Sequence, residues 1–220
     1  MCENMEIYLG FDPGGVDRFG WAVCSPSGPI LRVLARGKAG NAKEAITQAI
    51  SIVPEGGSVV GAGIDAPLFW TDHGGRDVDN LLRQAIKKLG APSPGGTVQN
   101  INSLRGACLV QGVLTASLLH KKYPGITITE SHPKALLYLL GIAGAQRDAD
   151  AVTMADLTRH FASDTDSVAQ HERDALLGAF TAFAGRERRQ AWKNLFDEEK
   201  ETVIPFDYPV AYWMPWDRVE

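Results

Sequence analysis

The chain has little cysteine, no long hydrophobic run and no excess of basic residues, and each of these features excludes a class of protein. The three cysteines, Cys2, Cys24 and Cys108, follow no zinc or redox spacing, and a scattered set favours a reducing compartment. No segment approaches the roughly 18 to 20 apolar residues of a membrane span, and no basic stretch followed by an apolar run opens the sequence. We therefore expect a cytoplasmic protein that is not inserted in a membrane.

Charge and size set further limits. The net charge is −4 and the pI is near 5.8, which argues against a protein that coats nucleic acid by bulk charge. An enzyme that grips a short stretch of nucleic acid locally remains compatible with this balance. With 220 residues, of which 45% are hydrophobic and 22% charged, the chain is expected to fold as one domain over 1–220.

The order of apolar runs predicts a mixed α/β fold. Three short runs at 7–12, 19–25 and 30–36, separated by Gly/Pro turns, predict antiparallel strands. Two later runs, at 58–65 and 126–130, predict strands parallel to the first. Helices are expected from Asn41 to about 53 and at 77–89, 104–120, 133–140, 151–161 and 169–189. The whole is a five-stranded mixed sheet flanked by helices, with a helical insertion over 68–125 and an aromatic, proline-containing extension over 190–220 that packs on the domain.

Four acidic residues are similarly placed along this fold. Asp12, Asp65 and Glu130 each follow or end an apolar strand-like run, and Asp174 lies within the last predicted helix. Functional groups gather outside the carboxyl ends of adjacent parallel strands, so we expect the four to converge. A carboxylate at the mouth of a buried strand costs free energy unless it is compensated. The usual compensation is a divalent cation, Mg²⁺ or Mn²⁺, because hard cations take oxygen ligands.

Converged carboxylates of this kind suit phosphoryl chemistry. Two ions roughly 3.5–4 Å apart stabilise the attacking and the leaving oxygen of an in-line displacement. Asp12, on the first strand, is the expected bridging ligand, with Asp65 and Asp174 flanking it. Glu130 is expected either to complete the second metal or to position the attacking water.

The segments around these acids resemble a known group of proteins. Residues 12–14 (Asp-Pro-Gly) and 20–22 (Gly-Trp-Ala) are similar to the opening hairpin of the ribonuclease H-like superfamily, which also opens the Holliday-junction resolvases. Segments 63–68, 130–133 and 171–176 are closer to one branch, an uncharacterised family of predicted nucleases described as a domain of unknown function. The resemblance covers roughly 6–185. It implies a ribonuclease H-like fold, metal-dependent nuclease activity on nucleic acid, and Asp12, Asp65, Glu130 and Asp174 as the matching acids.

The insertion at 68–125 departs from the pattern of that superfamily. Within it, Arg76 and Arg83 either bind a substrate phosphate or belong to a solvated helix face. His132 and His171 stand next to motif acids and either transfer a proton or serve as packed, hydrogen-bonded residues. Lys134 either contacts a phosphate or is solvated in the first turn of its helix.

Each acid also has a purely structural interpretation. Asp12 could cap the turn at Gly14, Asp65 could merely end a strand, and Glu130 could cap the helix that begins near Pro133. Asp174 could form a local salt bridge on its helix.

At the level of function, a metal-dependent nuclease is the leading hypothesis. A catalytically silent binding or scaffold protein of the same fold is the first alternative. An actin-like ATPase or sugar kinase is the second, although 220 residues leave little room for the repeated domain it needs. DNA or RNA substrate and endo or exo mode stay open, and the aromatic tail is a candidate homodimer contact.

Overall fold

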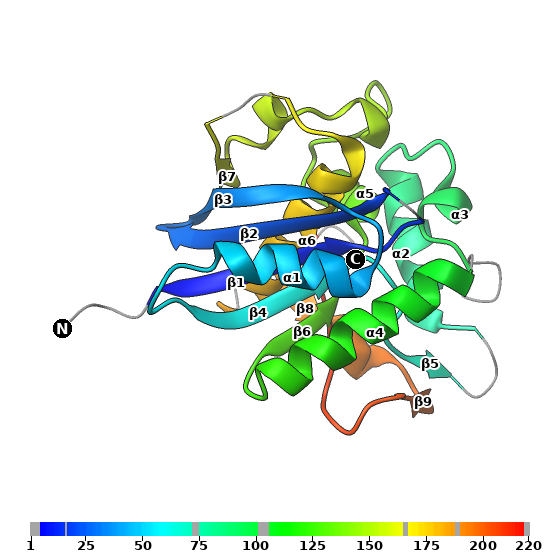
Figure 1. Ribbon diagram of the computed structural model, residues 1–220. Coiled ribbons are helices and arrows are strands. Elements are labelled where there is room, and N and C mark those ends of the chain that lie inside the picture. Colours follow the sequence, from blue (N-terminus) through cyan, green and yellow to red (C-terminus); the bar gives the residue numbers. More distant parts are fainter. Residues whose placement is uncertain are drawn as a thin grey trace.

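A mixed sheet of eight strands, in the order β7-β3-β2-β1-β4-β6-β10-β8, forms the centre of the molecule (Figure 1). The computed structural model describes residues 5–15, 17–71, 75–100, 106–164, 167–187 and 190–217. The strands are β1 (Glu6–Asp12), β2 (Phe19–Ser27), β3 (Ile30–Ala39), β4 (Ser58–Ile64), β6 (Thr127–Glu130), β7 (Phe161–Ala162), β8 (Trp192–Asn194) and β10 (Ala211–Pro215). A separate two-stranded sheet pairs β5 (Trp70–Thr71) with β9 (Thr202–Val203).

The inner five strands have the predicted directions, but the predicted count of five was wrong. β1, β2 and β3 are antiparallel neighbours, and β4 and β6 run parallel to β1. β10 extends the sheet beyond β6 as a further parallel strand, β8 pairs antiparallel with β10, and β7 pairs with β3 at the other edge. Without β10, β6 would be an edge strand with unpaired backbone N–H and C=O groups. The aromatic C-terminal segment pairs with these groups as β10, and Tyr212 lies opposite Glu130.

The helices are α1 (Ala42–Ile52), α2 (Asp77–Lys88), α3 (Pro94–Thr97), α4 (Gly106–Lys122), α5 (Pro133–Leu139) and α6 (Gln170–Arg186). Within the described residues, none of them is long and apolar enough to cross a bilayer. The predicted start of α1 is confirmed, because the Asn41 side chain accepts a hydrogen bond from the backbone N–H of Glu44.

The helix predicted over 151–161 does not form. Short 3₁₀ turns at Ala149–Ala151 and Met154–Leu157 take its place, followed by β7. The Asp148 side chain accepts from the Asp150 N–H, and Thr153 and Asp156 exchange hydrogen bonds. These local bonds each start a new turn and compete with a continuous helix.

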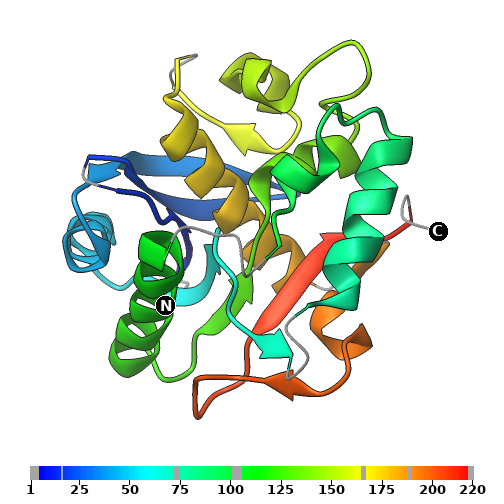
Figure 2. The same ribbon diagram turned by 90° about the vertical axis from the view of Figure 1, so that its right-hand side faces the viewer.

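The helices cover both faces of the sheet. α6 lies across one face against β1, β2 and β4, whereas α1 and α4 lie on the opposite face (Figures 1 and 2). α6 approaches the sheet backbone to backbone. A Cβ atom built on Gly10 would lie 1.7 Å from the Ala175 carbonyl oxygen, and one on Gly63 would lie 2.0 Å from that of Gly178. The absence of side chains at these two glycines therefore lets α6 sit directly over β1 and β4.

Candidate metal centre

Three of the four acidic residues that were expected to converge lie together at the end of the sheet where the parallel strands finish. Asp12 is the last residue of β1, and Asp65 follows β4 directly, with its N–H donating to the Phe11 carbonyl at 2.8 Å. The close packing of α6 brings Asp174 to the same end of the sheet. Burial raises the pKa of Asp65 well above its ordinary value, and the charges of Asp12, Asp174 and Glu130 raise it further.

The other two acids of this group are strongly buried. Asp12 is 8% exposed and Asp174 is 4% exposed. Burial raises the pKa of Asp174 to about 6, although the charge of Arg173 opposes the shift. Burial also raises the pKa of Asp12, against the lowering effect of its hydrogen bond with His171. Hereafter Asp12, Asp65 and Asp174 are called the acidic centre.

Two residues of α6 orient the acidic centre. His171 Nδ1 lies 2.5 Å from Asp12 Oδ2, and this hydrogen bond raises the pKa of His171. Arg173 is buried and donates from Nε and Nη2 to Asp174 Oδ1, at 3.0 and 2.8 Å. Its Nη1 donates to the carbonyls of Ala149 and Val152. Arg173 and Asp174 therefore form the local salt bridge that the sequence offered as the structural interpretation of Asp174. The additional bonds of Arg173 to the Ala149 and Val152 carbonyls were not predicted.

A cavity of about 200 Å³ opens beside the acidic centre. The residues that line it include Asp12, Asp65, Gly96, Thr97, Gln99, Cys108, His132 and Lys134. Lys134 lowers the pKa values of all three acids by its charge, while its Nζ lies 2.8 Å from Asp150 Oδ1. A ligand in this cavity can therefore contact the carboxylates of Asp12 and Asp65 and the amine of Lys134.

Glu130 lies at the end of β6 in a different environment. It is fully buried, and its two oxygens accept hydrogen bonds from Arg76 Nη1 and Nη2, at 2.8 and 2.7 Å, and from the Leu68 N–H at 2.9 Å. His132 Nε2 lies 3.1 Å from Oε1. Burial alone would raise the pKa of Glu130, but the adjacent charge of Arg76 lowers it to about 2. The carboxylate is ionised and already fully hydrogen-bonded.

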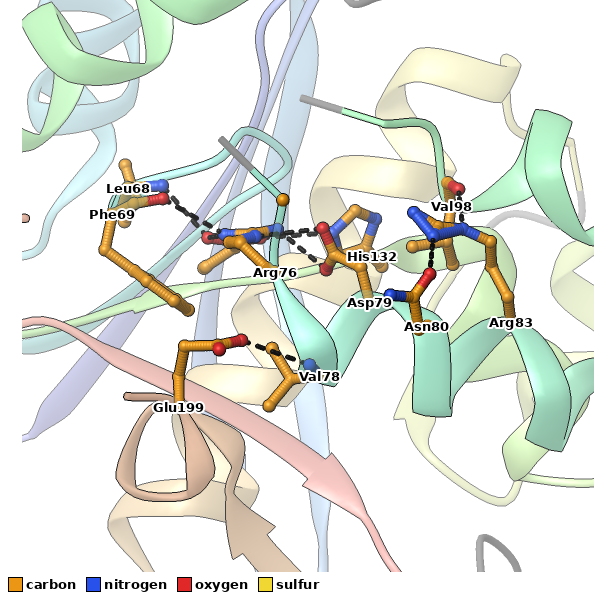
Figure 3. Close-up of polar contacts among 12 residues, drawn as sticks. Leu68, Phe69, Arg76, Val78, Asp79, Asn80, Arg83, Val98, His132 and Glu199 are labelled. Carbon is orange, nitrogen blue, oxygen red and sulfur yellow. Dashed lines mark hydrogen bonds and ion pairs between the residues drawn. The ribbon is translucent and has the colours of Figure 1, made fainter. Parts of the chain in front are cut away.

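Arg76 is the centre of this second group. It also donates from Nε and Nη2 to both oxygens of Asp79, at 2.9 and 2.8 Å (Figure 3). Its guanidinium carbon lies 4.5 Å from the centre of the Phe69 ring and 5.5 Å from that of Tyr212. Arg76 is only 3% exposed, so it is not available to a substrate phosphate. We call Arg76, Asp79, Glu130 and His132 the arginine cluster.

Arg83 is not among the residues that line the cavity, and its hydrogen bonds are made elsewhere. Its Nε donates to the Val98 carbonyl at 3.1 Å and its Nη1 to Asn80 Oδ1 at 2.8 Å (Figure 3). These bonds tie α2 to the segment after α3. They give Arg83 a structural role, and its contact with a substrate phosphate stays a prediction.

The arginine cluster also contains a set of atoms with metal-ligand spacing. Ligand atoms of Asp79, Glu130 and His132 lie within 4.8 Å of one another. The Arg76 guanidinium, however, forms short hydrogen bonds to both carboxylates and supplies the positive charge that a cation would supply. The acidic centre, whose pKa values are raised, is therefore the better candidate for a metal.

Comparisons with known proteins leave the family open. No family model matches the chain, and no curated protein matches it. Among solved structures, the chain is similar to RuvC from Thermus thermophilus, with 14% identity over 82% of this chain and 96% of that chain and a TM-score of 0.39. A likeness this weak does not bear on function, and the resemblance to a nuclease family in the sequence motifs stays a prediction.

Proposed function

We propose that the protein is a metal-dependent nuclease, a phosphodiester hydrolase in which Asp12, Asp65 and Asp174 hold Mg²⁺ or Mn²⁺. The observation that carries this proposal is the convergence of three carboxylates whose pKa values are all raised. Such a site is unfavourable when all three groups are ionised, because like charges in a buried position repel. An oxygen-binding divalent cation removes that penalty.

The donor chemistry of the three residues suits such an ion, while ligand atoms within 4.8 Å of one another are found, among the described residues, at Asp79, Glu130 and His132. All three side chains offer oxygen ligands at the end of the sheet, and the adjoining cavity gives access from solvent. Bound there, a divalent cation would stabilise negative charge on the oxygens around a phosphorus atom that water attacks. Glu130 is left out of the proposed ligand set, because its oxygens are engaged by Arg76, Leu68 and His132.

The chain itself supplies orientation around this site. Arg173 fixes the rotamer of Asp174, and His171 fixes that of Asp12, by the hydrogen bonds described above. Glu130 accepts from the Leu68 N–H and so holds the segment that follows Asp65. Side chains held in this way keep their oxygens in one geometry, which lowers the entropy lost when a ligand binds.

The test is Mn²⁺-dependent cleavage of a panel of labelled single strands, duplexes, RNA–DNA hybrids and branched DNA. We expect cleavage by the wild type and a loss of at least about 100-fold in Asp12→Asn, because a ligand to the metal is removed. Asp197→Asn, at an exposed acid of the 3₁₀ turn Leu195–Glu198, is the matched control and should cleave normally.

Calorimetry with Mn²⁺ separates the two parts of the proposal. Binding that is lost in Asp12→Asn and kept in Asp197→Asn supports the metal centre. A wild type that neither binds Mn²⁺ nor cleaves any substrate contradicts the proposal and favours a catalytically silent binding protein of this fold.

A further inference from the structure

A second cavity continues from the one beside the acidic centre. It has a volume of about 230 Å³ and shares Gly96, Thr97 and Lys134 with the first. Its other lining residues are Pro92, Ser93, Tyr138, Asp148, Ala149 and Asp150. The two cavities, which we call the track, therefore adjoin at Lys134.

Lys134 lies at this junction and forms a solvent-exposed ion pair with Asp150. Pro133 opens α5 and Lys134 follows it, in the first turn. Its Nζ is paired with Asp150 Oδ1 at 2.8 Å, but the two side chains are 35% and 57% exposed. An ion pair as exposed as this contributes at most about 1 kcal/mol. Exchange of Asp150 for another anion therefore costs little.

We propose that the track receives one strand of nucleic acid, an inference that rests on the proposed function. In this complex one backbone phosphate lies at the acidic centre, and Lys134 leaves Asp150 to bind the neighbouring phosphate. At that centre, the exposed fraction is 8% for Asp12 and 4% for Asp174. The cavity lined by Asp12, Asp65, Gly96 and Lys134 is the route that we assign to a phosphate that reaches this centre. Asp150 holds the lysine in place until the strand arrives.

The track has too little positive charge to hold a duplex. Among the described residues that line it, Lys134 is the one lysine or arginine, and Asp12, Asp65, Asp148 and Asp150 are acidic. Affinity for a duplex comes mainly from the neutralisation of many phosphates by lysine and arginine. One lysine in a recess cannot supply this, whereas a flexible single strand can enter the recess and present one phosphate to it.

Binding of a fluorescein-labelled oligothymidylate, followed by anisotropy with Ca²⁺ in place of Mn²⁺, tests the proposal without cleavage. We expect Lys134→Gln to weaken binding about tenfold, because a charge-assisted hydrogen bond is lost. The slope of log K against log salt should fall by about 1. Lys134→Arg should restore most of the affinity, and Asp150→Asn should tighten binding about two- to fivefold.

Lys43→Gln, at an exposed position in the first turn of α1, is the matched control and should leave binding unchanged. An unlabelled duplex of the same strand should compete at least about tenfold less well than the single strand. Equal competition by the duplex, or an unchanged Kd in Lys134→Gln, overturns the proposal. Because Mn²⁺ binding and cleavage are measured separately, either result can be told apart from a failure of the metal centre.

Cys108 gives a readout that does not depend on affinity. It lines the track beside Asp12 and Asp65, whereas Cys24 is buried. In a Cys2→Ser background, saturating oligothymidylate should slow the reaction of Cys108 with a thiol reagent in the wild type. If oligothymidylate at saturating concentration also protects Cys108 from the thiol reagent in Lys134→Gln, the strand still lies in the track and the variant has lost affinity alone. Saturation without any protection of Cys108 in the wild type places the strand elsewhere and contradicts the proposal.

Discussion

Two groups of carboxylates lie at the same end of the sheet and differ in how their charge is balanced. In the arginine cluster, a buried guanidinium contacts both Asp79 and Glu130, and the pKa of Glu130 falls to about 2. In the acidic centre, three carboxylates converge, and the pKa values of all three are raised. In the arginine cluster one guanidinium contacts both carboxylates, whereas in the acidic centre the buried Arg173 contacts Asp174 and neither Asp12 nor Asp65. This difference in compensation separates carboxylates that are structural from those available to a metal.

The largest expected effect comes from removing the buried guanidinium of Arg76. Arg76→Met leaves Glu130 and Asp79 buried without their partner and should destabilise the protein by about 3–5 kcal/mol, measured by urea unfolding. Arg83→Met, on α2, loses one part-buried and one exposed hydrogen bond and should cost about 1 kcal/mol. Equal losses in the two variants would show that the arginine cluster has no special energetic role.

The next effect is on the packing that builds the acidic centre. In Gly10→Ala the new methyl group meets the Ala175 carbonyl at 1.7 Å, so α6 must shift and carry Asp174 with it. We expect a loss of about 1–3 kcal/mol and weaker Mn²⁺ binding by calorimetry. Gly125→Ala, where a Cβ atom meets nothing within 4 Å, is the control. Unchanged Mn²⁺ affinity in Gly10→Ala would separate Asp174 from the metal.

A smaller effect of opposite sign is expected at the acidic centre itself. Asp65→Asn removes one of three repelling carboxylates and should stabilise the metal-free protein by about 1 kcal/mol. Added Mn²⁺ should raise the Tm of the wild type and leave that of the variant nearly unchanged. If Asp65→Asn instead destabilises the metal-free protein, its carboxylate is not under electrostatic strain and the contrast with the arginine cluster fails.

A further effect is expected in the pH dependence of stability. The pKa of Asp174 rises from 3.8 to about 6 on folding. Its stabilising contribution is therefore complete below about pH 4 and lost as the pH rises through 6. Glu130, whose pKa falls from 4.5 to about 2, contributes above about pH 4.5 and loses that contribution as the pH falls toward 2. Urea unfolding of the metal-free protein should show a decline between pH 4 and 6 that Asp174→Asn reduces. An identical decline in that variant would contradict the raised pKa.

Local patterns predicted much of the fold. The apolar runs located the inner five strands, and Asn41 with Glu44 located the start of α1, because strand burial and helix capping depend on residues close in sequence. The strands β8 and β10 were missed, since an aromatic segment with prolines pairs with β6 only once the edge of β6 exists. The 3₁₀ turns at Ala149–Ala151 and Met154–Leu157 replaced a predicted helix through side-chain bonds that propensity does not weigh.

The sequence by itself determined which carboxylates stand at strand ends and that a buried helix follows with Asp174, because chain order and hydrophobic periodicity are local properties. Only the tertiary structure decided the partners of Asp12 and Glu130. Arg76 is 54 residues from Glu130 and His171 is 159 residues from Asp12. Such pairs depend on how β6, α2 and α6 pack in space, and electrostatic compensation follows distance in space and not distance along the chain.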